Sequence, residues 1–322
     1  MLTYTNEQDD ISTMRIVIIG SAGQVGRALM TQDWGSLVGG DPIDVIGMTR
    51  EDLDVTNSLA TRERLQTLSP DWVINASAYT AVDAAETDSV SAYAVNCEAP
   101  ECLASSCHSI GAKFVHISTD YVYSGQGSAP VSENQAIGPT SVYGASKLAG
   151  ELLVTRACKE HIVLRTAWVF SATGNNFVKT MLRLSADREQ ISVVNDQWGG
   201  PTSAAGIANA IALIIRSVDE TQSSGRSTDH LWGTYNFSGE PYINWMQFAE
   251  TIFNQAQSTG LLKSVPRVQS ITTEQYVTPA RRPLNSRLSN DKVQRAFGLP
   301  PDNWKRGLGD VLEQLMAQRL VK

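Results

Sequence analysis

The sequence lacks the long apolar run and the leader that membrane and secreted proteins carry. It contains no stretch of about 18 consecutive apolar residues, so no membrane-spanning helix is expected. Its first residues, MLTYTNEQDDIST, are polar and acidic, whereas a signal peptide is basic and then apolar. We expect residues 1–13 to form a disordered extension before a domain that begins at Met14, and we expect a cytoplasmic protein.

Cysteine and positive charge are also scarce. The chain has four cysteines, none of them in a CxxC pair, and a formal net charge of −7. Without a signal peptide, these cysteines are expected to be reduced thiols rather than disulfides or metal ligands. The acidic balance argues against a nucleic-acid surface. An anionic small molecule could still be bound through local positive charge and backbone N–H groups.

What the sequence does contain is an alternation of short apolar runs and helical patterns over its 322 residues. Strands alternating with helices predict an α/β fold, a Rossmann-type doubly wound parallel sheet. We expect strands within 14–20, 43–49, 71–80, 113–119, 161–170, 191–205 and 233–239. We expect helices at about 59–68, 89–109, 139–154, 205–215, 245–257, 290–297 and 304–320.

The same pattern suggests two units. The predicted dinucleotide-binding domain covers 14–170 and includes returns of the chain to the main sheet at about 191–215 and 233–238. The predicted substrate lobe is smaller and interleaved with it, over 171–190 and 239–322. Residues 218–230 are polar and are expected to form a loose surface segment.

A glycine turn follows the first predicted strand and precedes a helix. Its glycines are Gly20, Gly23 and Gly26. The first permits a tight turn, the second lets a pyrophosphate approach the backbone, and the third lets the helix pack on the strand. In this context the motif predicts dinucleotide binding rather than an ordinary turn. Arg50 ends the second strand, where an acidic residue would select NAD and an arginine favours NADP, although a plain surface arginine is the alternative.

The pair Tyr143 and Lys147 lies one turn apart on a predicted helix face. A lysine ammonium beside a phenol lowers the tyrosine pKa from its ordinary value of about 10, which would suit Tyr143 to proton transfer. The alternative is an exposed YxxxK pair that occurs by chance. Thr119 ends the strand ahead of this helix and can hydrogen-bond a substrate carbonyl. His116, within that strand, is expected to be a core residue and not a catalyst.

The glycine turn, the Ser/Thr strand end and the YxxxK helix, in that order, resemble the extended short-chain dehydrogenase/reductase family from Met14 to the end of the chain. The stretches that carry the resemblance are GQVG, NASAYTAVD, STDYVY, VYGASKLAGE, RTAWVF, GNNFVKTMLRL, NDQWGGPT and TPARRPLNSRL. They are most similar to members that reduce the C4 ketone of dTDP-4-dehydro-L-rhamnose with NADPH or NADH. The resemblance implies that Tyr143 donates the proton, Thr119 holds the oxygen, and Lys147 keeps the tyrosine pKa low and binds the nicotinamide ribose.

The resemblance also implies further contacts. It places the cofactor against Gln24, Val25, Asp54, Val55, Ala78, Tyr79 and Thr80, and the sugar nucleotide against Asp120, Trp168 and Asn176. Arg281 and Arg282 are expected to pair with the diphosphate, because two guanidinium groups suit a dianion. Members that dimerise through magnesium carry acids where this chain has Ala28 and Gln190. We therefore expect no metal, and a monomer or homodimer.

Three alternatives stay open at the level of sequence. A nucleotide-sugar dehydratase of this fold carries Glu where this chain has Tyr121, because elimination of water needs an acid and a base. An epimerase would retain its NAD permanently. A non-catalytic regulatory protein, similar to the beta subunit of methionine adenosyltransferase, would bind without turnover.

Overall fold

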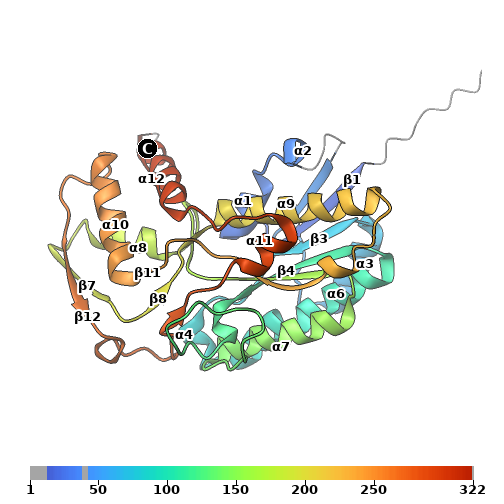
Figure 1. Cartoon of the computed structure of the whole chain (residues 1–322), viewed down its shortest axis with the longest axis horizontal. Coiled ribbons are helices and arrows are strands. Elements are labelled where there is room, and N and C mark those ends of the chain that lie inside the picture. The colour runs from blue at the N-terminus through green and yellow to red at the C-terminus, as the bar shows by residue number, and fades with distance from the viewer. Residues whose placement is uncertain (1–12, 38–42, 321–322) are drawn as a thin grey trace, which may run out of the picture.

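A six-stranded parallel sheet forms the centre of the part of the chain that the computed structural model describes, residues 13–37 and 43–320 (Figure 1). Its strand order is β10-β5-β4-β3-β1-β2. The bounds are β1 Met14–Ile19, β2 Ile43–Met48, β3 Trp72–Asn75, β4 Lys113–Thr119, β5 His161–Thr166 and β10 Gly233–Asn236. The predicted Rossmann-type sheet is confirmed; the predicted extension, up to residue 12, lies outside the described residues.

Both faces of this sheet are covered by helices, because successive strand side chains point to opposite sides. In β1, Ile16 and Ile18 pack toward α1 (Gln24–Met30) and α9 (Ala204–Ser223). Val17 and Ile19 pack toward the opposite helix layer. That layer consists of α3 Ser58–Leu68, α6 Ala99–Ile110 and α7 Val142–Ala157. Figure 1 shows the two helix layers on either side of the strands.

The helix predicted at 89–109 is interrupted. It divides into α5 (Ser89–Tyr93), a π-helical turn η1 (Ala94–Glu98) and α6. The wider turn directs Asn96 at the loop after β3, where its Oδ1 accepts from the Tyr79 N–H at 2.9 Å and its Nδ2 donates to the Tyr79 carbonyl at 3.1 Å. This turn therefore fixes the loop at the open end of the sheet.

A second hydrophobic core lies beside the sheet, at the left of Figure 1. It joins Phe170 to α8 Phe177–Leu184, α10 Trp245–Ser258, α12 Trp304–Leu320 and β7 Gln190–Val194. The predicted return of the 191 strand to the main sheet is wrong, because β7 pairs with β12 (Arg267–Ile271). The physical reason is that β7 leaves Gln190 and Ser192 exposed on one face, whereas a central parallel strand is buried on both faces.

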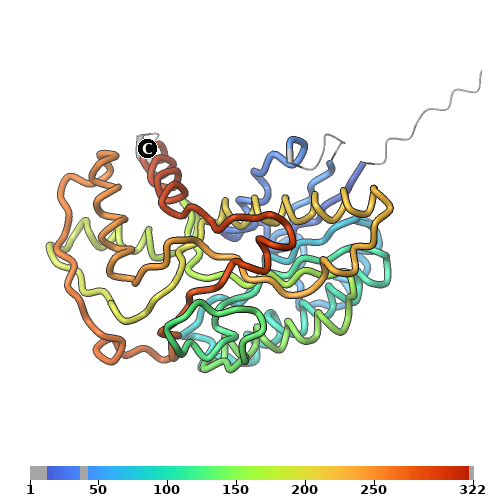
Figure 2. The backbone as a smooth tube through the Cα atoms, in the orientation of Figure 1, coloured from blue at the N-terminus to red at the C-terminus, as the bar shows by residue number. Residues whose placement is uncertain are grey.

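The other predicted return, at 233, is confirmed by the pairing of β10 with β5. Figure 2 lets the chain be followed from the sheet into the second core, back through α9 and β10, and out again to α10. The helix expected to end at 215 continues to Ser223, so the loose segment expected from 218 begins as helix. The strand predicted at 161–170 is broken at Trp168, whose φ of 51° is left-handed.

The remaining elements are short. They are α2 Trp34–Leu37, α4 Val82–Ala85, β6 Val169–Phe170, β8 Trp198–Gly199, β9 Thr202–Ser203, β11 Ile243–Asn244, β13 Asn285–Ser286 and α11 Asp291–Phe297, with 3-10 turns at 120–122, 229–231 and 273–275. None of the helices within the described ranges combines the length and apolar character needed to cross a bilayer.

Candidate active site

The helix that carries Tyr143, α7, begins at Val142, three residues after the start of the range expected from the sequence. Ser141 caps it, its Oγ accepting from the Gly144 N–H at 3.2 Å. Lys147 lies one turn after Tyr143 and is only 1% exposed, and the Thr119 side chain at the end of β4 is close enough to the Tyr143 hydroxyl to lower its pKa. The structure thus brings the three predicted catalytic residues to one place, at the carboxyl end of a central strand.

The expected low pKa of Tyr143 is wrong. Burial raises its pKa to about 12, and the nearby Thr119 side chain opposes this rise only in part. Burial also lowers the pKa of Lys147 to about 8, against the opposing effect of the Glu151 carboxylate. The reason is that a phenolate and an ammonium both lose solvation in this enclosed place. Tyr143 is therefore a neutral phenol, the form that can donate a proton.

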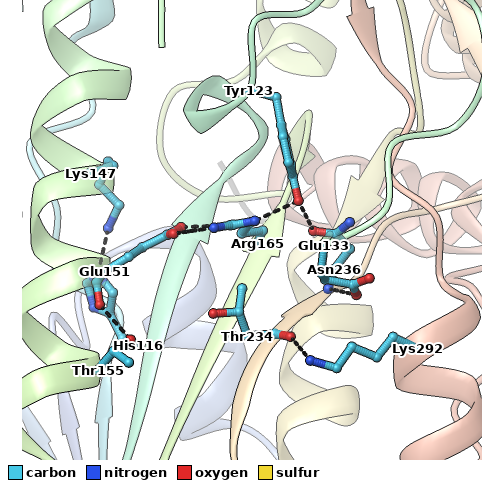
Figure 3. A network of polar contacts seen from close by, with 10 residues as sticks. All are labelled: His116, Tyr123, Glu133, Lys147, Glu151, Thr155, Arg165, Thr234, Asn236 and Lys292. Atoms are coloured by element: carbon cyan, nitrogen blue, oxygen red, sulfur yellow. Dashed lines mark hydrogen bonds and ion pairs between the residues drawn. The ribbon is translucent and has the colours of Figure 1, made fainter. Parts of the chain in front are cut away.

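Lys147 is held by β4. Its Nζ donates to the Ile117 carbonyl at 2.7 Å and lies 3.2 Å from Nε2 of His116, a contact visible in Figure 3. Sequence reasoning placed His116 in the core, where it is fully buried, but missed this contact. The alternation of side chains along β4 could have indicated this contact. Phe114 packs with the helix layer that contains α7, and His116, two residues further along the strand, faces the same side.

Asp120 and Trp168, the residues expected at the sugar, have unusual surroundings. Burial raises the pKa of Asp120 to about 6, although Thr119 donates to its Oδ1 at 3.1 Å and the nearby Ser286 also lowers the pKa. Trp168 stacks on Trp245 with ring centroids 3.6 Å apart and planes 12° apart. The pattern did not single out Trp245, because the stack joins two segments far apart in the chain.

Two further residues expected at the substrate are engaged with the protein itself. Asn176 caps α8, and its Nδ2 donates to Gln24 Oε1 at 2.8 Å. Arg282 forms an ion pair with Asp83, Nη2 to Oδ2 at 2.7 Å, while Arg281 is exposed. Asp83 also accepts from the Ala280 N–H at 3.1 Å. The basic loop is thus tied to α4, and sequence reasoning did not foresee Asp83 as its partner.

A cleft of about 300 Å³ opens at the point between β1 and β3 where the strand order reverses, the usual ligand position in such sheets. Seven of the predicted cofactor residues line it: Gly20, Gly23, Arg50, Asp54, Val55, Ala78 and Tyr79. Six others, Gln24, Val25, Gly26, Thr80, Tyr143 and Lys147, do not. Residues that the sequence did not single out also line it: Ile19, Ala22, Thr49, Leu53, Ala76, Ser77 and Val95.

The glycine turn fits the pyrophosphate of a dinucleotide. A Cβ on Gly20 would lie 2.7 Å from the Ser77 nitrogen, and one on Gly26 would overlap the Gly20 carbonyl oxygen. Side chains there would fill the cradle or separate α1 from β1. At the rim of the cleft, Arg50 and Asp54 offer a cation and a carboxylate to an adenosine. The residues present therefore suit NADP or NAD.

A larger hollow, of about 650 Å³, lies between α1, α9 and α12. Arg27, Asn209 and Asp310 are among the residues that line it. Because Tyr143, Lys147 and Thr119 do not line it, the larger volume of this hollow does not make it the candidate active site. Within the described ranges, no group of three or more His, Cys, Asp or Glu side chains is placed to hold a metal ion.

Comparison with known proteins agrees with this geometry. Residues 14–317 match the sequence profile of the "RmlD substrate binding domain". A protein of Aggregatibacter actinomycetemcomitans named dTDP-4-dehydrorhamnose reductase is 40% identical over 92% of this chain and 98% of its own. Two solved structures of that name, from Clostridium acetobutylicum and from Bacillus anthracis in complex with NADP, are 35% and 32% identical. Each superposes with a TM-score of 0.83 over 94% of this chain and all of its own.

Proposed function

Since the chain belongs to the RmlD substrate binding domain family, we propose that it reduces the C4 ketone of dTDP-4-dehydro-L-rhamnose to dTDP-L-rhamnose with NADPH. The observation that carries the proposal is the cluster of Thr119, Tyr143 and Lys147 beside the dinucleotide cleft. Asn96 joins the two: it donates to the Tyr79 carbonyl on the cleft wall and, at 3.0 Å, to Ser146 Oγ on α7.

The chain's own residues supply the acid chemistry of this reduction. A bound NADPH supplies the hydride. As negative charge develops on the C4 oxygen, Tyr143 donates its proton to it and Thr119 donates a hydrogen bond. The buried, neutral phenol is the protonation state that this direction of reaction needs. When NADPH is bound, Lys147 would hold the ribose of its nicotinamide through an N–H that is not donated to the Ile117 carbonyl.

In this proposal the sugar nucleotide lies between the end of β4 and the lobe built on the second hydrophobic core, which contains α8, β7, α10 and α12. We propose that Asp120 and Trp168 contact the sugar and that the exposed Arg281 pairs with the diphosphate. Arg282 is already paired with Asp83, so its role is to hold the loop that presents Arg281. The preference for NADPH over NADH rests on Arg50 at the rim of the cleft.

The test is the substitution Tyr143→Phe, which removes the donated proton and keeps the ring. We expect kcat for the reduction of dTDP-4-dehydrorhamnose to fall by roughly 10²- to 10⁴-fold. The Kd for NADPH, followed by its fluorescence, should change little. The matched control is Tyr93→Phe on α5, which should keep full activity, since Tyr93 is 37% exposed and lies outside the cleft. Reduction by Tyr143→Phe at the wild-type rate would contradict the proposal.

Elimination by a dehydratase is disfavoured by the residue after Asp120. Tyr121 stands there, so no second carboxyl group follows Asp120. Burial raises the pKa of the Tyr121 phenol, which therefore cannot replace a carboxylate as a base. An epimerase would keep its cofactor through desalting, whereas this reductase should release it. A non-catalytic binding protein would have no need of the Thr119, Tyr143 and Lys147 set. Absence of NADPH and NADH oxidation with dTDP-4-dehydrorhamnose would favour that class.

A further inference from the structure

The stretch NDQWGGPT carries part of the family resemblance but takes no part in the proton transfer from Tyr143. Its residues Trp198 and Gly199 form β8, the middle strand of a three-stranded sheet between β11 and β13. Ser286 of β13 pairs with Gly199 and lies near Asp120, since it lowers the pKa of that carboxyl group. The stretch therefore passes beside one of the residues expected at the sugar.

Trp168, the other residue expected at the sugar, is held by side chains outside its own segment. Its left-handed φ of 51° is unfavourable for a residue with a large side chain, and such a conformation persists only where the surroundings impose it. A Cβ on Gly199 would lie 2.6 Å from the Trp168 ring, so β8 packs closely on that indole. Trp245 stacks on the same ring with planes 12° apart. Whatever fixes Trp245 therefore also fixes Trp168.

Trp245 is fixed in turn by Gln197, the residue that precedes β8. The indole Nε1–H can only donate, and it lies 3.1 Å from Gln197 Oε1. With Oε1 accepting, the Nε2 group of the Gln197 amide faces Thr273 Oγ1 at 3.1 Å and donates to it. Gln197 is 4% exposed, so water has little access to either bond. Both ends of its amide are therefore engaged with the protein.

The far end of this arrangement is anchored on Asp196. The Thr273 hydroxyl donates to Asp196 Oδ1 at 2.7 Å, and the Thr273 N–H donates to Oδ2 at 2.9 Å. Because the hydroxyl hydrogen is committed to the carboxylate, the Thr273 oxygen offers a lone pair to Gln197. The bonds thus run in one direction, from the Trp245 N–H through Gln197 and Thr273 to the carboxylate. Thr273 also opens the segment that leads to the basic loop with Arg281.

We propose that Gln197 is a positioning residue of the sugar site, which fixes the plane of the Trp245 ring and, through the stack, that of Trp168. The order of hydrogen bonds stands on the contacts alone; its effect on sugar binding rests on the proposed reduction. Without Gln197, Trp245 could rotate and Trp168 could tilt, so the sugar would meet a less ordered surface. Pre-ordering that surface lowers the entropy cost of binding equally for substrate and transition state. Gln197 should therefore affect KM and leave kcat nearly unchanged.

The test compares two substitutions of Gln197. Gln197→Met keeps the length of the side chain and removes both hydrogen bonds, whereas Gln197→Glu keeps an acceptor for the Trp245 N–H whether its carboxyl group is ionised or protonated. Gln197→Met should raise the KM for dTDP-4-dehydrorhamnose about threefold to tenfold, the effect of one lost hydrogen bond. Gln197→Glu should raise it by less than about twofold, because the bond to Trp245 is conserved. In both variants kcat and the Kd for NADPH should stay within about twofold of wild type.

A readout that needs no substrate is the indole ¹H–¹⁵N spectrum of the full-length protein. In Gln197→Met the Trp245 signal should move because its N–H has lost the acceptor, and the Trp168 signal should move with it because the rings are stacked. Gln197→Glu should leave the Trp168 signal near its wild-type position. The chain has seven tryptophans, so Trp168→Phe and Trp245→Phe assign the two signals.

The matched control is Gln255→Met at the other end of α10. It makes the same chemical change in the same helix and removes one hydrogen bond, from Gln255 Nε2 to the Lys305 carbonyl at 3.3 Å. It should move neither the two indole signals nor the KM. A general loosening of the lobe would show itself in this variant as well as in Gln197→Met.

A wild-type KM in Gln197→Met would overturn the proposal, and so would an equal rise of KM in Gln197→Met and Gln197→Glu. If Gln197→Met does not fold, Trp245→Phe decides, since it removes the indole N–H and keeps the bond from Gln197 to Thr273: a raised KM supports the proposal and an unchanged one refutes it. Wild-type protein that fails to oxidise NADPH with dTDP-4-dehydrorhamnose would contradict the proposed function instead. The indole spectra would then still decide whether Gln197 holds Trp245 and Trp168.

Discussion

Among single residues, Asp120 combines burial with a charge. It follows Thr119 directly at the end of β4, is 3% exposed, and accepts from the Thr119 hydroxyl at 3.1 Å. Burial raises the pKa of its carboxyl group to about 6. A carboxylate kept in so unfavourable a place reduces the stability of the folded protein near neutral pH, which is typical of groups that serve a ligand rather than the fold.

The substitution Asp120→Asn should relieve this cost. The folded pKa of about 6 lies above the ordinary 3.8, so wild type loses stability as pH rises between these values and gains it back as pH falls. Below that window both states are protonated and the variant should show no such gain. Above it, the variant should be more stable by about 1–3 kcal/mol in urea denaturation. The same gain at both pH extremes would show that charge is not the cause.

The sequence could predict the parts of the site whose residues are close together along the chain, and it missed contacts between distant segments. Tyr143 and Lys147 share one helix face, and the glycine turn is continuous, so local periodicity was enough. Trp245 and Asp83 were missed because each meets its partner, Trp168 or Arg282, only after distant segments pack. The low pKa expected for Tyr143 failed because the degree of burial is a tertiary property.

At the scale of elements, α7 is the platform of the site and is fixed from two sides. The buried Arg165–Glu151 pair holds it to β5, and Gly150 packs against the π-helical turn η1. A Cβ on Gly150 would overlap the Asn96 carbonyl oxygen, which leaves room for no side chain. The same turn orients Asn96 toward the cleft, so the fit of α7 and the shape of the cofactor site are coupled.

Gly150→Ala should therefore separate α7 from η1 and destabilise the protein by about 1–3 kcal/mol. Gly309→Ala in α12 is the matched control, since the nearest atom to its new Cβ would be 4.0 Å away. In that helix the substitution should be neutral or stabilising by about 0.5–1 kcal/mol. Thermal unfolding of both variants checks this. Equal melting temperatures would mean that the contact with Asn96 is not tight.

The sequence predicted where strands and helices occur more reliably than it predicted which strands pair with each other. Runs of β-branched residues gave the central strands, since a strand buried on both faces is apolar throughout. The pairing of β7 with β12 was missed, because the choice of partner depends on which faces are covered. The break at Trp168 was missed for a different reason: no glycine marks its left-handed φ.

At the scale of the whole molecule, polar bonds join the sheet to the lobe. Arg282 reaches Asp83 on α4, and Asn176 reaches Gln24 on α1. Each bond joins residues more than 150 positions apart along the chain. We infer that these two bonds set the distance between the main sheet and the lobe in the absence of ligand.

If Arg282 acts by tethering, Asp83→Asn and Arg282→Gln should raise the KM for the sugar nucleotide by a similar factor, about twofold to fivefold for a partly exposed pair. The double variant should be no worse than either single one, because both remove the same bond. Steady-state kinetics in low salt is the measurement, with Arg281→Gln as the comparison. A much larger effect of Arg282→Gln than of Asp83→Asn would instead indicate that Arg282 binds the diphosphate itself.

The stack of Trp168 on Trp245 has an optical consequence. Two nearly parallel indoles with centroids 3.6 Å apart absorb ultraviolet light as one coupled unit, and the sign of their circular dichroism couplet depends on their mutual rotation. A sugar seated against Trp168 would change that rotation or its environment. Occupancy of the lobe can therefore be recorded without a label, and separately from the absorbance of NADPH.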